Sequence, residues 1–283
     1  LSSIARTAGL FVAALRAGNT AALLGIFGPD SDHLVASGDE VADRTAREAF
    51  LRSMAAGHRL EAQADGSMVL LVGPDSWPMP IPLTQADGAW VFDAGRGQQE
   101  VLNRRIGRNE LTTIQFLRQI VTAQHDFATR RQAETGRPVF ARRFISTPGT
   151  QDGLIWETPE GQPHSPLGAW AMAHEAEGYP DAHMPTPDGV IVSHGYRFRI
   201  LTAQGPQASG APGSYLQGGA MTRGWAVIAW PAHYGASGIM TFIVSHQGVV
   251  YERNLGEQTD RIVARITRFD PDANWSPVAD GAR

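Results

Sequence analysis

The sequence predicts an α+β fold in two domains, and two observations support this prediction. First, helix-like segments open each half of the chain and strand-like segments follow them. A regular alternation of strands and helices would instead predict a parallel sheet. Second, the chain has 283 residues, of which 42% are hydrophobic and 18% charged, enough to build two cores of ordinary size. We therefore expect one domain over residues 1–105, with helices before an antiparallel sheet, and a second over residues 106–283.

Apolar residues at helical spacing predict three helices at the start of the first domain. The first carries Ile4 to Leu15 on one face and stops at Gly18, the second runs from Thr20 to Phe27 with Thr20 as its cap, and the third covers residues 43–56. Four short runs then read as strands, separated by Asp-Gly and Gly-Pro turns: 59–64, 67–72, 81–85 and 89–92. The alternating prolines at 78, 80 and 82 predict an edge strand or an extended wall.

A long helix over residues 109–131 is predicted to form the spine of the second domain, packed on an antiparallel sheet. Residues 146–222 are rich in glycine and proline, which prevents long regular elements and leaves one helix at 167–177. Antiparallel strands are expected between residues 196 and 255, and a C-terminal helix over 257–268.

Composition excludes several kinds of chemistry. All 24 residues of the Lys+Arg count are arginines and there is no cysteine, so lysine Schiff bases, thiol nucleophiles, thiolate metal sites and disulfides are ruled out. A GC-rich coding bias also explains the missing lysines. The net charge is −4 and neither half is basic, which argues against nucleic-acid binding. No apolar run approaches the roughly 20 residues that cross a bilayer.

The start of the chain and its composition indicate an exported protein. The sequence begins with Leu1 rather than Met, which is typical of a chain whose N-terminal secretory segment has been removed. A chain without cysteine is also compatible with an oxidising envelope compartment. We expect a periplasmic or secreted bacterial protein.

Motifs in both halves resemble known families. Gly195-Tyr196-Arg197-Phe198 and the later segment 229–235 follow the long helix in the order found in type IV pilin and type II secretion pseudopilin globular domains. The apolar half-helix that anchors a pilin has no counterpart here, so the resemblance does not imply incorporation into a filament. The segment Ala89-Trp90-Val91-Phe92-Asp93, with the helices before it, resembles the nuclear transport factor two-like, cystatin-like cone.

Nearly the full chain, including residues 77–82 and 105–111, resembles a bacterial family catalogued as domain of unknown function two-nine-five-zero. Members of that family typically carry export signals, so the resemblance implies an envelope or extracellular location. It implies no particular activity.

The cone resemblance implies an apolar pocket in the first domain. Candidate ligand-binding residues there are the polar groups His33, His58 and Asp93, with Trp77 and Trp90 as lining. The alternative is a cone filled by its own side chains, in which Asp93 only caps the next segment.

Arginines and aromatic residues of the second domain form a candidate partner surface: Arg130, Arg131, Arg142, Arg143, Trp230 and Tyr234. Guanidinium groups and exposed aromatic rings are frequent in contacts with proteins and acidic groups. The alternatives are structural. Cations near a helix C-terminus complement its dipole, and aromatic residues on strands pack in a core.

The spacing of the histidines argues against a metal site. His164, His174, His183 and His194 recur at intervals of about ten residues, near Glu175, Asp181 and Asp188, but no two histidines have the spacing of a helical ligand pair. We therefore expect loop histidines, no metal and no cofactor. No G-x-S-x-G or G-x-G-x-x-G motif occurs, so we predict no catalytic set.

Two functions remain open at the level of sequence. The first is a non-enzymatic interaction protein of the envelope, associated with a pilus or secretion system, whose second domain binds a protein partner. The second is a small-molecule binding protein or enzyme that uses the pocket of the first domain.

Overall fold

The computed structural model describes residues 3–28, 30–159, 161–179, 186 and 188–279, and it confirms an α+β fold. The chain divides into two compact units, Leu1–Gly107 (unit 1) and Arg108–Arg283 (unit 2). Each unit has its own hydrophobic core and its own antiparallel sheet. The division falls two residues after the boundary that the sequence predicts, inside a helix.

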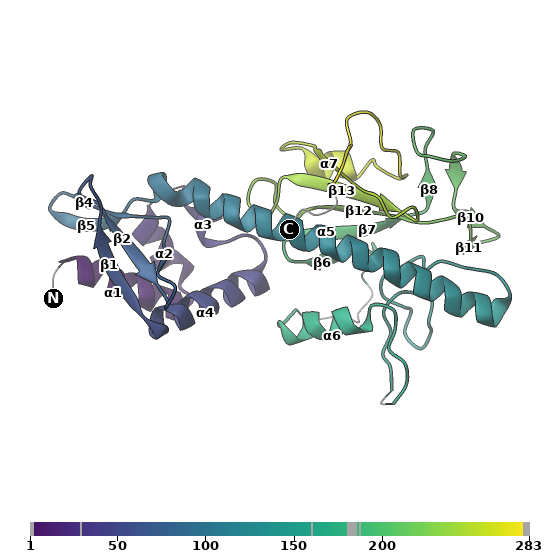
Figure 1. Cartoon of the computed structure of the whole chain (residues 1–283), viewed down its shortest axis with the longest axis horizontal. Coiled ribbons are helices and arrows are strands. Elements are labelled where there is room, and N and C mark those ends of the chain that lie inside the picture. Colours follow the sequence, from purple (N-terminus) through teal and green to yellow (C-terminus); the bar gives the residue numbers. More distant parts are fainter. Residues whose placement is uncertain (1–2, 29, 160, 180–185, 187, 280–283) are drawn as a thin grey trace. The chain divides into compact units, whose positions relative to one another are not determined.

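Unit 1 places helices before a small antiparallel sheet (Figure 1). Its helices are α1 (Ser3–Arg16), α2 (Thr20–Phe27), α3 (Asp32–Val35) and α4 (Glu40–Ala56). Its strands are β1 (His58–Ala62), β2 (Met68–Val72), β3 (Trp77–Pro78), β4 (Leu83–Ala86) and β5 (Ala89–Phe92). The strand order is β1-β2-β4-β5, and β3 pairs with β2, so the proline run is partly an edge strand.

Local capping fixes where two of these helices begin. The Asn19 side chain accepts a hydrogen bond from the amide of Ala22, so Asn19 caps α2 and Thr20 is its first residue. Asp39 caps α4 in the same way, which starts this helix three residues before the predicted Asp43.

Aromatic side chains fill the interior of unit 1. Phe11 makes ring contacts with Phe27, Phe50 and Phe92, with centroid distances of 4.9 to 5.8 Å. These rings belong to the hydrophobic core that α1, α2, α4 and β5 share.

Helix α5 (Ala94–Thr135) is much longer than the predicted helix over 109–131. The extra part contains Gly95, Gly97 and Gly107, which read as helix breakers in the sequence. Gly97 has a packing role there, because a Cβ at this position would lie 2.3 Å from the carbonyl oxygen of Pro80. The glycine therefore allows the helix to pass close to the backbone before β4.

Unit 2 is built on a six-stranded antiparallel sheet in the order β15-β14-β13-β12-β7-β6. Figure 1 labels β13, β12, β7 and β6 of this sheet. The strands of the sheet are β6 (Ile191–Ser193), β7 (Tyr196–Leu201), β12 (Ala226–Pro231), β13 (Met240–Ser245), β14 (Val250–Asn254) and β15 (Ser276–Pro277). Two small ribbons pair β8 (Ala203–Gln204) with β9 (Gly213–Ser214), and β10 (Leu216–Gln217) with β11 (Ala220–Met221). The remaining helices are α6 (Gly168–Ala176) and α7 (Thr259–Val263).

The second part of α5 packs on this sheet. Its buried residues Ile114, Leu117, Ile120 and Phe127 join the core of unit 2 with the central strands. Close to the start of this part, the carboxylate of Glu110 accepts hydrogen bonds of 2.9 Å from the amides of residues 239 and 240, which ties α5 to the beginning of β13.

The predicted C-terminal helix over 257–268 is wrong in length, because α7 ends at Val263. The guanidinium group of Arg199 donates hydrogen bonds of 2.8 Å to the carbonyls of Val263 and Ile266. These bonds satisfy carbonyls at the end of α7, so the chain can leave the helix there.

The 42-residue helix α5 is long but carries many charged side chains. Among the described residues, no helix combines the length and the apolar character needed to cross a membrane.

Candidate functional site

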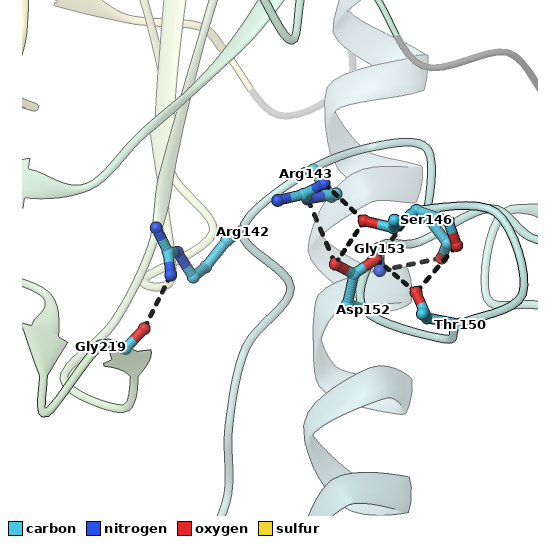
Figure 2. Close-up of polar contacts among 8 residues, drawn as sticks. Arg142, Arg143, Ser146, Thr150, Asp152, Gly153 and Gly219 are labelled. Carbon is cyan, nitrogen blue, oxygen red and sulfur yellow. Dashed lines mark hydrogen bonds and ion pairs between the residues drawn. The ribbon is translucent and has the colours of Figure 1, made fainter.

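A small pocket in unit 2 carries two of the predicted partner residues, Arg142 and Arg143. Its volume is about 260 Å³, and its wall also includes Phe144, Thr186 and Asp188. Both arginine side chains are exposed. The Arg142 side chain reaches toward Gly219, whereas the Arg143 side chain lies beside Asp152 (Figure 2).

The two arginines differ in their partners. Arg142 donates a hydrogen bond of 2.8 Å to the carbonyl of Gly219, and no carboxylate in the described part of the chain pairs with it. Arg143 lies 3.5 Å from a carboxylate oxygen of Asp152 and donates to the hydroxyl of Thr147. Within the described ranges, Arg142 is thus held by a carbonyl without a carboxylate partner, whereas Arg143 pairs with an acid.

Helix α5 holds this segment through Gln124, whose side chain is completely buried. The Gln124 amide donates to the carbonyl of Ala141 and accepts from the amide of Ala141, both at 2.9 Å. The Gln124 side chain thus satisfies both backbone groups of Ala141, as a neighbouring strand would do in a sheet. The backbone at the pocket is thus fixed by a buried side chain of the long helix.

The turn after Arg143 is closed by hydrogen bonds around Asp152 (Figure 2). Burial raises the pKa of this carboxyl, but hydrogen bonds from Thr147 and Thr150 and the charge of Arg143 outweigh burial, so the pKa is lowered overall. Gly153 donates to the Ser146 hydroxyl, and a Cβ on it would lie 2.8 Å from the backbone of the opposite arm. The turn is therefore charged, internally bonded and closely packed.

The other predicted partner residues have structural contacts. Arg130 pairs with Asp126 and Arg131 pairs with Glu134, each within α5. Trp230 is only 6% exposed and donates its indole N–H to Asp260, so it offers little surface to a partner. Tyr234 is half-buried and donates to Asn254. The structure does not gather these residues with Arg142 and Arg143.

The five candidate ligand residues of the first domain lie apart. His33 is exposed on α3, Trp77 is 41% exposed beside Arg104, and half-buried Trp90 lies on β5. Asp93 directly precedes α5. Only His58 lines the large groove of unit 1.

That groove has a volume of about 780 Å³ and lies between α1, the end of α4, β1 and β2. Its wall is mostly apolar, with small residues of α1 on one side: Ala5, Ala8, Gly9, Val12 and Ala13. Leu60, Leu70 and His58 form the opposite side. The volume lies in the range of small-molecule sites.

A model of the family described as "Protein of unknown function (DUF2950)" matches residues 2–278. The chain belongs to the DUF2950 family. This confirms the membership that the sequence indicates. No curated protein and no solved structure matches the chain, so the resemblances to pilins and to cystatin-like cones stay predictions.

The DUF2950 chain also brings together side chains that the sequence left apart. His174 and His194 come close to Glu177, a residue that sequence reasoning missed. The missed signal was the i, i+3 spacing of His174 and Glu177 at the end of a predicted helix. His164 is exposed, and its carbonyl accepts from Arg130. His183 and Asp181 lie outside the described residues.

Proposed function

We propose that this DUF2950 protein is a non-enzymatic binding protein of the bacterial envelope, and that its pocket beside Arg142 receives an acidic group of a protein partner. The observation that carries the proposal is the exposed guanidinium of Arg142, fixed by the Gly219 carbonyl and paired with no carboxylate among the described residues. A guanidinium group with open donors binds carboxylates through two parallel hydrogen bonds.

Apolar wall residues and a fixed backbone also support binding at this pocket. Phe144 and Ile145 contribute to its wall, and the backbone before them is fixed by Gln124. A fixed cation loses little side-chain entropy when a partner binds. The envelope location follows the export signals that the family resemblance implies.

The test compares capture of envelope proteins by three full-length chains: wild type, R142Q and R137Q. Arg137 is also exposed but does not line the pocket, so R137Q removes the same charge from the same region. The partner captured by wild type and by R137Q should be retained at least about tenfold less by R142Q. Equal capture by all three chains would contradict the role of the pocket.

The groove of unit 1 supports a second candidate function, binding of a small apolar ligand. A Cβ on Gly9 meets no atom within 4 Å, so G9F places a ring in the groove without a backbone clash. Gly25 is an equally open helical glycine outside the groove, and G25F is the matched control. An apolar fluorescent dye should bind to wild type and G25F and lose binding in G9F. Unchanged binding in G9F would count against the groove.

A further inference from the structure

Three side chains from two elements of unit 2 meet at one point. His174 and Glu177 lie one helical turn apart at the end of α6, and His194 lies in the turn between β6 and β7. One potential ligand atom from each residue lies within 4.8 Å of the others. Nε2 of His194 lies 3.0 Å from Oε2 of Glu177.

The turn that carries His194 has an unusual residue for its conformation. Ser193 pairs with Tyr196, so His194 and Gly195 form a two-residue hairpin loop, with φ values of 48° and 77°. Such a loop favours Asn-Gly, because both positions need positive φ. Histidine adopts positive φ more readily than most residues with a side chain, but asparagine and glycine are favoured over it in such a loop. Residues with a side chain that are held at positive φ are concentrated at functional sites.

Both imidazoles are oriented by contacts outside the cluster. His174 is 4% exposed and stacks on Trp170 and Tyr179, and its Nε2 lies 3.3 Å from the carbonyl of Val192. With Nε2 donating to this carbonyl, Nδ1 carries the lone pair. His194 contacts the Ser193 hydroxyl through Nδ1 at 2.8 Å, while its Nε2 faces Glu177. Metal-bound histidines are held in this way by a second hydrogen bond.

We propose that His174, Glu177 and His194 form a binding site for a divalent transition metal ion, with Zn²⁺ as the best-fitting ion. Two imidazoles and one carboxylate are a known three-residue ligand set for zinc. Tetrahedral ligands at about 2.0 to 2.2 Å from zinc lie about 3.3 to 3.6 Å apart, so the three groups need only small shifts to bind one ion.

The fourth ligand position of such an ion would face a cavity of about 180 Å³. Helix α5 contributes Thr112, Gln115 and Gln119 to its wall. Because three protein ligands leave one position open, the site would accept water or an external donor atom there. The ion would also join α6 to the hairpin of β6 and β7.

The experiment measures zinc binding by the full-length, chelator-treated chain, using competition with a chromogenic chelator. Wild type should bind one equivalent of Zn²⁺ tightly and should rise in thermal midpoint when zinc, but not Mg²⁺, is added. H194N and E177Q should each weaken binding at least about tenfold, since each loses one of three ligands. Co²⁺ in place of zinc should give the visible bands of a four-coordinate site in wild type and lose them in H194N.

Two controls make the result decisive. Asparagine suits the left-handed turn, so H194N should keep the fold and its zinc-free thermal midpoint should not fall. H233N removes an exposed histidine outside the cluster and should bind zinc as wild type does. Absence of tight binding in wild type would overturn the proposal. Equal affinity in H194N, or equal loss in H233N, would also overturn it, and the contact between His194 and Glu177 would then be structural only.

Discussion

Asp65 closes the turn between β1 and β2 through its carboxylate. It accepts hydrogen bonds from the hydroxyl and the amide of Ser67 and from Arg96, and these contacts lower its pKa from 3.8 to about 2. An acid with a lowered folded pKa stabilises the protein above its unfolded pKa, and this contribution is lost as the pH falls through the folded value.

We therefore predict that D65N makes the free energy of unfolding less sensitive to pH between about 3.8 and 2 than it is in wild type. Denaturant unfolding at several pH values in this window measures the effect. Identical pH slopes for the two chains would show that the turn does not hold the carboxylate charged.

At His246 the protein favours the neutral form of a base, whereas at Asp65 it favours the charged form of an acid. Burial lowers its pKa from 6.5, and the nearby His125 lowers it further against the effect of a backbone contact to Trp225. Above pH 6.5 such a base is neutral in both the folded and the unfolded protein and does not affect stability. As the pH falls from 6.5 through the pKa of the folded state, the unfolded protein binds the proton more readily, so the folded state is destabilised.

Wild type should thus lose stability between pH 7.5 and 5, and H246Q should lose less, because glutamine does not titrate. Urea unfolding at the two pH values provides the comparison. A variant that loses as much stability as wild type would mean that His246 is protonated in the folded state.

At the scale of elements, the contact between α5 and Ala141 depends on one polar side chain. Gln124 is completely buried and exchanges two hydrogen bonds with the backbone of Ala141. Leucine would nearly fill its volume but would leave a buried N–H and a buried C=O without partners.

Q124L should therefore lower the free energy of unfolding by about 2 to 4 kcal/mol. It should also weaken partner capture, because Ala141 precedes Arg142. The exposed Gln132, on the same helix, gives the control Q132L, which should change stability by less than about 0.5 kcal/mol. Equal effects of the two substitutions in urea unfolding would argue against the role of Gln124.

The sequence predicts elements that depend on local signals, and it misses elements that depend on tertiary contacts. Antiparallel strands were predicted between residues 196 and 255, and β7, β12, β13 and β14 lie there, since alternation and turn residues are local signals. The first part of α5 was not predicted. Gly97 lowers helix propensity there, while its role is a close approach to Pro80, distant in sequence. Tertiary packing overrides helix propensity at such positions.

The same distinction applies to the candidate sites. The sequence singled out Arg142 and Arg143 because they belong to a local cluster of arginines. It did not show that only Arg143 pairs with an acid, because that contact depends on the turn that carries Asp152. His174 and His194 were weighed as ligands and rejected for their spacing. A hairpin turn brings His194 to the end of α6. Rules that rely on the spacing of ligands along the sequence cannot predict this contact.

At the scale of the whole molecule, each unit has a core of its own residues. The core of unit 2 contains only residues from Ile114 onward, and Glu110 ties the helix to β13 within the same unit. We propose that unit 2 folds independently, although α5 continues across the boundary.

A fragment of residues 108–283 should then unfold in one cooperative transition, with a thermal midpoint within a few degrees of a transition of the full chain. Circular dichroism on both chains is sufficient for this comparison. A fragment without cooperative unfolding would show that residues before 108 are required for its fold.

The central claim is that the pocket beside Arg142 binds a partner in the envelope. Cross-linking in living cells tests it most directly, with a photoreactive residue at the exposed pocket position 186 and, as control, at exposed position 45 in unit 1. We predict one discrete adduct from position 186, absent from position 45, lost with R142Q and retained with R137Q. An adduct that survives R142Q, or no adduct from position 186, would contradict the claim.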